Sequence, residues 1–358
     1  MKRFAFPKTN RQPMRFKYFT ILVFVFSSVV VFGQTGGNNT FEFLNLVSPA
    51  RSAGLGGNAI ATHADDVSLA LQNPSQLQPY MHRQLSFSYV GHVAGIKFGD
   101  VIYAHNLKKF GTIAGYLHFV NYGTFKETDE TSLETGSFKA SENAVGVTWS
   151  KALDSSLYIG TTLKGIFSNM GLGNTSNGVA ADVALTYYNP DKQFCATLVA
   201  KNFGTQIKKY DGAEKEDLPF EIQAGISKKL LNAPFRFSLI GQQLQKFDIT
   251  YKDPNQNGID PLTGENKVEN ITLGDKLIRH AIMNVEILFT KNFNVRLGYN
   301  FLRRKELALS EKKGLAGVTA GIGFKISKFQ FSYAKSVYVP FDGSNHFTIS
   351  TNFGDFLK

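Results

Sequence analysis

The chain has 358 residues and a formal net charge of +11, from 39 basic and 28 acidic residues. Six of the basic residues precede the first acidic one, and without them the balance is 33 to 28, or +5. An excess this small argues against a nucleic-acid-binding protein, which needs a concentrated basic face. The single cysteine, Cys195, excludes a disulfide framework and a cysteine-based metal site.

The first 33 residues are typical of a secretory signal peptide. The six early cations are followed by the apolar run 18–32, and Val31 and Gly33 suit the positions before a cleavage site. This order predicts export and cleavage after Gly33. An uncleaved anchor is the alternative, but the run is shorter than the about 20 apolar residues that a helix needs to cross a bilayer. We therefore assign 1–33 to a signal peptide.

Residues 34–83 follow no regular pattern and predict a compact plug, or hatch. Asp65–Asp66 are suited to cap a short helix over 67–72, because a side-chain oxygen there can accept a hydrogen bond from the first turn. Asn73–Pro74 would end that helix, since proline disfavours helix at the residue before it. The pair Gly56–Gly57 permits a tight turn.

From residue 84 onward, short segments alternate apolar and polar residues. Val183 and Leu185 would face one way, and Asp182 and Thr186 the other. Side chains of a strand point to opposite faces with a period of two, so each segment predicts a strand with one apolar face. The predicted strands are 84–91, 95–106, 111–122, 137–151, 156–169, 178–188, 193–204, 218–228, 235–247, 279–289, 293–301, 315–326, 329–338 and 346–353.

Loop lengths separate a soluble β-sandwich from a membrane barrel, which show the same alternation. The gaps after even-numbered strands are short, and those after odd-numbered strands, beyond the first, are longer, up to the 31 residues of 248–278. A membrane barrel sorts its loops in this way, with short turns in the periplasm and long loops outside. We therefore predict an all-β fold: a transmembrane up-and-down antiparallel β-barrel of about 14 strands over 84–358, in the outer membrane, with both termini periplasmic and 34–83 as a periplasmic hatch.

The polar faces of these strands would line the lumen with charges of both signs. Two interpretations are open: a polar conduit, or an interior of paired charges that fills the barrel. The second is favoured because a barrel of this strand number is narrow unless it is kept open. The predicted lumen residues are Lys164, Asp182, Lys201, Glu221, Gln223, Arg236, Gln242, Asn284, Glu286, Arg296 and Asn300.

Motifs for metal binding or catalysis are weak. In the longest loop, Asp253, Asn255, Asn257 and Gly258 resemble a calcium loop, but Glu265 comes one residue late for the bidentate ligand. A polar turn explains the same residues. The seven histidines show no helical pair beside a glutamate, and no Gly-x-Ser-x-Gly elbow is present. We expect no cofactor, no metal site and no enzyme activity.

A family resemblance lies in the hatch. Phe43–Leu46, Ala50-Arg51, Leu55-Gly56-Gly57 and Asn73-Pro74 are similar to the N-terminal hatch of barrels in the FadL-like superfamily, and most similar to the PorV and PorQ group of the Bacteroidetes type IX secretion system. Ser75 departs from the alanine that is usual there. The predicted hatch-motif residues are Ala50, Arg51, Gly56, Gly57, Asn73 and Pro74.

The resemblance implies a structural role in protein secretion. It implies that the barrel holds a PorZ-like surface protein in the complex that attaches cargo to lipopolysaccharide, in company with the PorU/PorV attachment complex. Outer-membrane lipid and lipopolysaccharide are further expected partners, the latter through basic loop pairs such as Lys208-Lys209. The alternative function is that of a FadL-like transporter, which moves a hydrophobic small molecule through a gated lumen.

Overall fold

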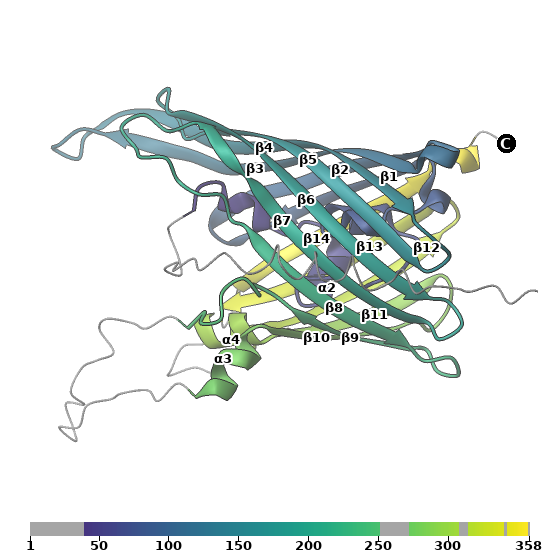
Figure 1. Ribbon diagram of the computed structural model, residues 1–358. Helices are drawn as coiled ribbons and strands as arrows, with labels where there is room; N and C mark the ends of the chain where they lie inside the picture. The colour runs from purple at the N-terminus through teal and green to yellow at the C-terminus, as the bar shows by residue number, and fades with distance from the viewer. Residues whose placement is uncertain (1–38, 251–271, 308–313, 340–341, 357–358) are drawn as a thin grey trace, which may run out of the picture. The chain divides into compact units, whose positions relative to one another are not determined.

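The computed structural model describes residues 39–250, 272–307, 314–339 and 342–356. The described residues belong to one compact unit, 35–358. They form a closed antiparallel barrel in which each strand pairs with its neighbours in sequence and β14 returns to β1 (Figure 1). The predicted fold class is confirmed. The predicted signal peptide 1–33 and the calcium-like loop Asp253–Glu265 lie outside the described residues.

Each of the fourteen predicted strands is present. The strands are β1 (Gln84–Gly91), β2 (Lys97–Asn106), β3 (Thr112–Thr128), β4 (Glu134–Ala152), β5 (Leu157–Asn169), β6 (Thr175–Asn189), β7 (Phe194–Lys208), β8 (Glu221–Lys229), β9 (Phe235–Gly241), β10 (Ala281–Ile287), β11 (Phe293–Asn300), β12 (Val318–Ile326), β13 (Phe329–Val339) and β14 (Asp342–Asn352). Their bounds differ from the prediction mainly at the rim that carries the connections 209–220, 242–280 and 301–317, which we call the long-loop rim. The opposite, short-turn rim carries connections such as 107–111 and 190–193.

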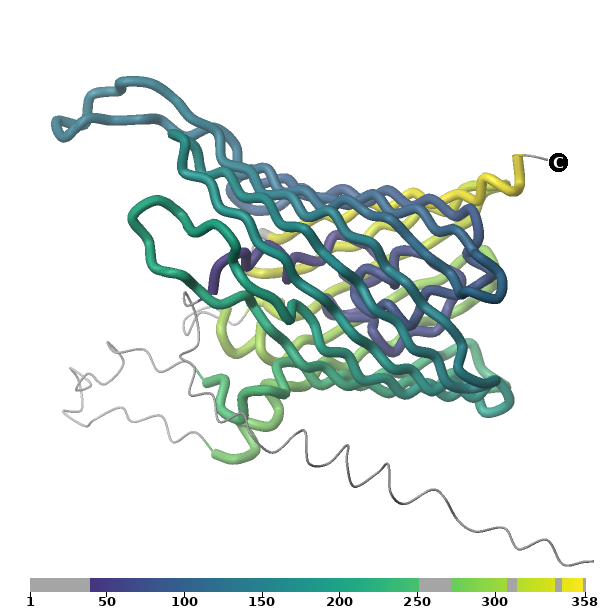
Figure 2. Tube along the Cα trace, turned by 45° about the horizontal axis from the view of Figure 1, so that its top comes forward, coloured from purple at the N-terminus to yellow at the C-terminus, as the bar shows by residue number. Residues whose placement is uncertain are grey.

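The predicted long loop 123–136 is wrong. β3 and β4 remain paired as far as Thr128 and Glu134, and only residues 129–133 connect them. The rings of Phe125 and Phe138 stack across this hairpin with centroids 5.5 Å apart. Figures 1 and 2 show the hairpin extending past the other strands. Outside a membrane both strand faces meet water, so the alternation of apolar and polar residues ends although the hydrogen-bonded ladder continues.

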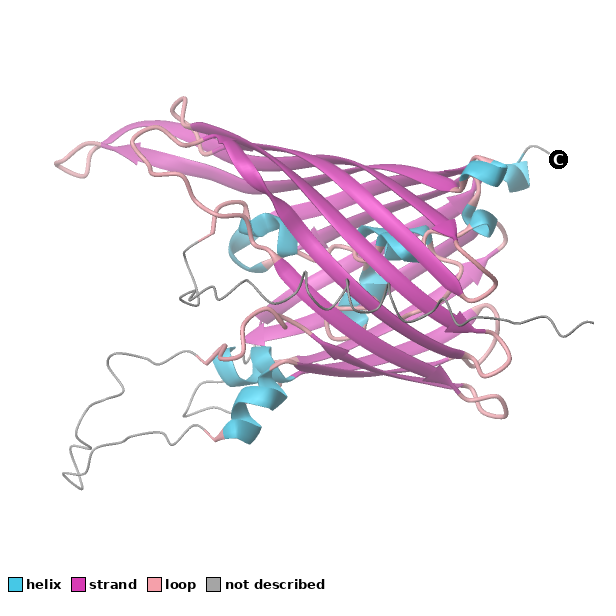
Figure 3. Ribbon diagram, viewed as in Figure 1, coloured by secondary structure: helices cyan, strands magenta, loops and turns pink. Residues whose placement is uncertain are grey.

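Two helices occupy connections that were predicted as loops. α3 (Leu273–Arg279) begins at Thr272, whose hydroxyl accepts a hydrogen bond from the backbone of Asp275 at 3.2 Å. α4 (Phe301–Leu307) follows β11 directly. Both lie at the long-loop rim, whereas the short helices of the hatch lie inside the barrel (Figure 3).

None of the described helices is long and apolar enough to span a membrane.

The outer face of the barrel is apolar, as the alternation predicted. Val183 is 53% exposed, whereas its neighbour Asp182 is 1% exposed and faces the lumen. Exposed apolar side chains recur on the other strands, among them Leu117, Val145, Leu163, Leu198, Met283, Leu297 and Phe347. Such an outward band is what a β-barrel needs in order to face lipid. The barrel is therefore built to span a bilayer.

The hatch runs through the whole lumen. At the long-loop rim, the backbone of Thr40 donates a hydrogen bond to the carbonyl of Asp217 at 2.9 Å, and at the short-turn rim Phe353 donates to Arg83 at 2.9 Å. The two described ends, Asn39 and Phe356, thus lie at opposite rims. The prediction that the hatch sits in one mouth is wrong for the described residues. Both termini, which were predicted to be periplasmic, lie outside the described residues. An even number of strands requires only that β1 begins and β14 ends at the same rim. It does not determine where the hatch before β1 begins.

The hatch and the wall share buried apolar clusters. Near the long-loop rim, Phe41 and Phe43 pack with Phe98 and Val120 of the wall. Toward the short-turn rim, Val67, Leu77 and Met81 pack with Ile102 and Ala104. Burial of apolar side chains is worth roughly 1.5–3 kcal/mol for each large residue. The hatch is therefore part of the folded core.

The loop-length pattern predicts the sidedness of the barrel. Residues Glu130 and Asp191 are exposed in connections at opposite rims, and the native Cys195 is buried. We expect a membrane-impermeant maleimide to label Glu130→Cys on intact cells, and Asp191→Cys only after permeabilisation. Labelling of both variants on intact cells would contradict the predicted orientation.

Candidate functional site

The candidate functional site is the contact between the hatch and the lumen wall. The hatch comprises η1 (Glu42–Asn45), α2 (Ala50–Gly54), η2 (Val67–Leu71), η3 (Pro74–Gln76) and η4 (Pro79–Met81). The predicted helix over 67–72 is present as η2, a 3₁₀ helix, and Asp66 caps it by accepting a hydrogen bond from the backbone of Ser68 at 3.1 Å. Each predicted hatch-motif residue lies in a buried contact inside the barrel.

Arg51 joins the hatch to the wall through a cluster of buried charges. Its guanidinium donates to Glu286 Oε1 at 2.8 Å and to Asp66 Oδ2 at 3.4 Å. Two wall arginines contact the same glutamate: Arg236 Nη1 lies 2.5 Å from Oε2, and Arg296 Nε lies 3.1 Å from Oε1. Glu286 is 1% exposed and Arg296 is fully buried. Three guanidinium groups therefore share one carboxylate.

The charges of this cluster depend on one another. The carboxylates of Glu286 and Asp66 both contact the Arg51 guanidinium and favour its charged form. Arg51 therefore stays charged inside the barrel. A buried charge is tolerated only when it is paired and hydrogen-bonded, so each member of the cluster requires the others.

The sequence placed the wall members of this cluster in the lumen but did not bring them together. Arg236 and Arg296 stand directly opposite Glu286 on the strands at either side of β10. Cross-strand neighbours of opposite charge form favourable pairs. The register of β9, β10 and β11 could therefore have predicted that Arg236 and Arg296 contact Glu286. Arg51, which is 235 residues from Glu286 in the chain, had no such signal.

Asn73 and Pro74 form the second contact. The Asn73 side-chain oxygen accepts hydrogen bonds from the Ser75 backbone at 3.0 Å and hydroxyl at 2.6 Å. Its amide donates to the Ile60 carbonyl at 2.7 Å and to the Thr197 hydroxyl at 2.9 Å. Ser75, where alanine is usual in the resembling family, lies 2.7 Å from a wall threonine hydroxyl, so this departure adds a contact. Pro74 begins η3, a position that needs no backbone donor.

Gly56 and Gly57 form a tight turn against the wall. Their φ angles are +82° and +88°, which L side chains rarely adopt. The Gly56 backbone donates to the Thr319 hydroxyl at 2.9 Å, and the Gly57 carbonyl accepts from Gln72 at 3.0 Å. Ala50, at the start of α2, donates to the Thr348 hydroxyl at 2.9 Å. The motif residues thus exchange backbone hydrogen bonds with polar side chains.

Glycines of the barrel wall allow the backbone of the hatch to approach closely, and the sequence analysis did not identify them. A Cβ on Gly160 of β5 would lie 2.3 Å from the backbone of Pro74, and one on Gly298 of β11 would lie 2.1 Å from the backbone of Gly56. A glycine inside a strand often marks such a close approach of another backbone. Both glycines face motif residues, so the wall and the hatch are matched in shape.

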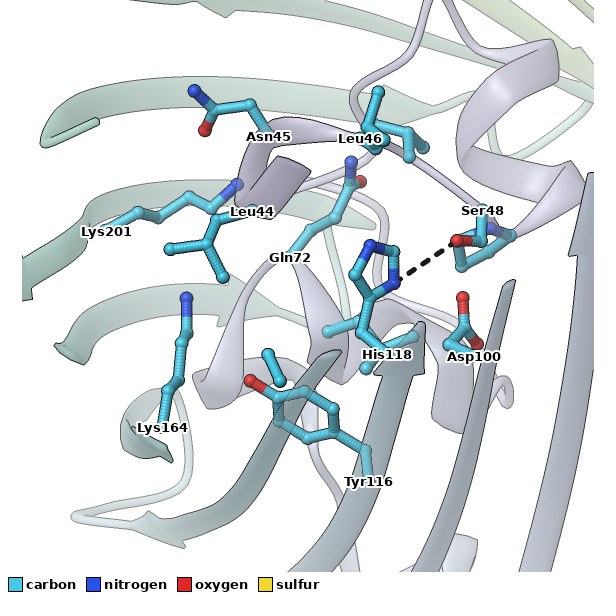
Figure 4. Close-up of a pocket in the computed structure, with 14 residues that line it drawn as sticks. Leu44, Asn45, Leu46, Ser48, Gln72, Asp100, Tyr116, His118, Lys164 and Lys201 are labelled. Atoms are coloured by element: carbon cyan, nitrogen blue, oxygen red, sulfur yellow. Dashed lines mark hydrogen bonds between the residues drawn. The ribbon is translucent and has the colours of Figure 1, made fainter. Parts of the chain in front are cut away.

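Two cavities that lie beside the hatch are small. One cavity, of about 50 Å³, lies between the hatch and the wall and is lined by residues that include Leu44, Leu46, Tyr116, His118, Lys164 and Lys201 (Figure 4). A polar cavity of about 220 Å³ lies near Asp65, Gln84 and Lys325 toward the short-turn rim. Pockets for drug-sized molecules are typically larger, roughly 300–1,000 Å³, and mostly apolar. The described lumen therefore agrees with a filled interior and not with an open conduit.

Comparisons with known proteins support the fold. No family model matches the sequence, and no curated protein sequence matches it. The chain is similar in structure to the toluene transporter TodX of P. putida, at 12% identity and a TM-score of 0.52, over 85% of this chain and 98% of that one. It is also similar to the toluene transporter TbuX of Ralstonia pickettii, at 11% identity and a TM-score of 0.50, over 86% and 98%.

The likeness to these solved structures supports the barrel fold of this chain. Identities this low show a shared fold alone. They do not bear on the type IX secretion group, because neither structure belongs to it by its description.

The ionic cluster predicts a large stability effect from a single substitution. Glu286→Gln would leave three buried guanidinium groups without their shared carboxylate, and we expect it to lower the free energy of unfolding by about 3–5 kcal/mol. Urea unfolding of the purified barrel in detergent measures this. The control is Glu134→Gln, which removes the exposed partner of Lys126 and should change stability little. Equal effects would contradict a special role for Glu286.

The matched shape of wall and hatch gives a second prediction. We expect Gly160→Ala to destabilise the protein by about 1–3 kcal/mol, because the added Cβ meets the backbone of Pro74. It should also make the hatch more sensitive to limited proteolysis. Gly115→Ala, in the outward face of β3 with nothing within 4 Å of the new Cβ, is the control and should be tolerated. Similar behaviour of the two variants would contradict a tight hatch contact at Gly160.

Proposed function

We propose that this protein is a non-enzymatic outer-membrane barrel that is closed by its own hatch and holds a PorZ-like surface protein at its long-loop rim, as a component of a type IX protein secretion system. The filled lumen carries the proposal. The hatch packs against the wall from the long-loop rim to the short-turn rim and is held by buried charges. A barrel whose interior is occupied in this way still has outer surfaces that are free to hold a partner, and this supports a scaffold.

The outer membrane is the proposed location. The outward apolar band supports a membrane-spanning barrel. The likeness to FadL-like outer-membrane barrels supports this location as well. The orientation, with the long loops toward the cell exterior, follows from the general rule that the short turns of such barrels are periplasmic.

The long-loop rim offers surfaces that suit a protein partner. The β3–β4 hairpin extends past the other strands and exposes Phe125 and Leu133 (Figure 2). On α3, Leu273 and Leu277 are also exposed. Exposed apolar groups beyond a lipid-facing band are typical of interaction surfaces.

The helical part of the rim is held in place by ion pairs. Lys305 of α4 lies 3.2 Å from Asp275 of α3, and Lys276 lies 2.6 Å from Asp248. The hydrogen bond from Lys276 holds the pKa of Asp248 well below its ordinary value. These pairs link α3 to α4 and to Asp248, in the first part of the connection that follows β9, which favours a defined surface at this rim.

Transport of a hydrophobic small molecule is the second candidate, and the fold comparisons favour it. TodX and TbuX are described as toluene transporters. In this function the contacts of Arg51 with Glu286 would have to open, because the cavity of about 50 Å³ is small for such a molecule. Both candidate functions therefore depend on the same contact between hatch and wall. The contact stays closed in a scaffold and opens in a transporter.

One experiment separates the two functions. Cells that lack the protein are compared with cells that carry the full chain or a variant whose turn 129–133 is replaced by a short Gly-Ser turn. For a scaffold, we expect deletion to release surface cargo into the medium and the turn variant to attach cargo poorly. The readouts are cargo attached to lipopolysaccharide and recovery of the PorZ-like protein with the tagged barrel.

Uptake of labelled toluene is measured in the same strains. For a transporter, deletion lowers uptake and leaves cargo attachment unchanged, and that result would refute the scaffold. Unchanged uptake with lost cargo attachment would refute the transporter. Heat-modifiable migration in gels shows that the turn variant is folded.

A further inference from the structure

The cavity between the hatch and strands β2, β3, β4, β5 and β7 has a polar side with an excess of positive charge. Lys164 of β5 and Lys201 of β7 extend into it from the wall, and Leu44 and Leu46 of the hatch form its apolar side. Figure 4 shows both ammonium groups aimed toward the space around Leu44. This cavity is separate from the cluster around Glu286, since the two share no residue.

Lys201 is buried without a partner. Its exposed fraction is 7%, and it has no hydrogen bond or ion pair with any residue in the described ranges of the chain. An ammonium group has three donors and is costly to bury unless an anion or acceptors compensate its charge. Its position beside a cavity, and not within packed side chains, leaves room for such a group.

Two carboxylates lie on the strands beside Lys201, and neither forms an ion pair with it. Glu221 stands directly opposite Lys201 in the register of β7 and β8, and its Oε1 accepts from the backbone of Gln243 at 3.0 Å. Asp182 lies 2.7 Å from Lys164 Nζ, and its other oxygen accepts from the Asn202 backbone at 2.8 Å. Lys164 also donates to the Asn202 side chain at 2.7 Å. Both oxygens of Asp182 therefore have partners, and Lys164 uses two of its three N–H donors. Asp100 lies beyond His118, on the far side of the cavity from the lysines (Figure 4).

A neutral donor faces the same space. Tyr116 lines the cavity, and its hydroxyl makes no hydrogen bond to another described residue. Its ring lies over Gly146 of β4, where a Cβ would come within 2.6 Å of the hydroxyl oxygen. The absence of a side chain at Gly146 therefore positions this hydroxyl at the cavity.

We infer that this cavity binds a small oxyanion of the phosphate or carboxylate type. Lys201 supplies the uncompensated charge, and Lys164 and Tyr116 supply further donors. Charge-assisted hydrogen bonds of this kind are short and strong. The cavity volume of about 50 Å³ admits one such group and not a long acyl chain. The inference is independent of whether the barrel acts as a scaffold or a transporter.

The test uses the purified full-length protein in a neutral detergent, free of phosphate and carboxylate buffers. Inorganic phosphate is titrated with ³¹P line width as the readout, and acetate with calorimetry. Dihexanoyl phosphatidic acid, a third probe, distinguishes a lipid headgroup from a free anion. We expect saturable binding of at least one probe to the wild-type protein.

Substitutions locate the site. We expect Lys201→Met to weaken binding by about tenfold or more, and Lys201→Arg, which keeps the charge, to retain it. Lys335→Met, which removes an exposed lysine on the outer face of β13, is the matched control and should bind like the wild type. If Lys201→Met does not fold, Tyr116→Phe and Lys201→Gln serve in its place. Absence of saturable binding of all three probes, or equal binding by the Lys201 and Lys335 variants, would overturn the inference.

Discussion

The rest of the structure depends on one buried carboxylate. Glu286 accepts from Arg51 of the hatch and from Arg236 and Arg296 of the neighbouring strands, so it fixes the hatch to the wall and holds three strands in register. In a low-dielectric interior such a group is stable only as a complete set. The hatch therefore does not rest loosely in a tube: its position is tied to the charge balance of the barrel.

Backbone hydrogen bonds impose the second constraint. The hatch has little regular structure of its own, so its polar backbone groups need partners inside the lumen. Wall side chains provide them: Thr348 accepts from Ala50, Asn284 donates to the Leu55 carbonyl at 3.2 Å, and Ser227 donates to the Ala61 carbonyl at 2.7 Å. This explains why the lumen face is polar. Its hydroxyl and amide groups serve the hatch.

These constraints frame the two candidate functions. A scaffold needs a stable barrel with an ordered outer rim, and the closed lumen, the β3–β4 hairpin and the paired helices α3 and α4 are consistent with that need. A transporter needs the same contacts to open in a controlled way. The difference between the two lies in the free energy of releasing the hatch, to which the charges around Glu286 contribute strongly.

The barrel could be predicted from the sequence alone. The opposite placement of Val183 and Asp182, repeated along fourteen segments, follows from the period of two in a strand, which is a local property that needs no knowledge of contacts. Only the tertiary structure showed that β3 and β4 form an extended hairpin, because water on both of its faces removes the alternation of apolar and polar residues. Only the tertiary structure showed that the hatch runs from rim to rim. It also decided the meeting of Arg51 with Glu286 and the cavity at Lys201. These depend on residues brought together by barrel closure from distant parts of the chain, and single-strand periodicity carries no information about such distances.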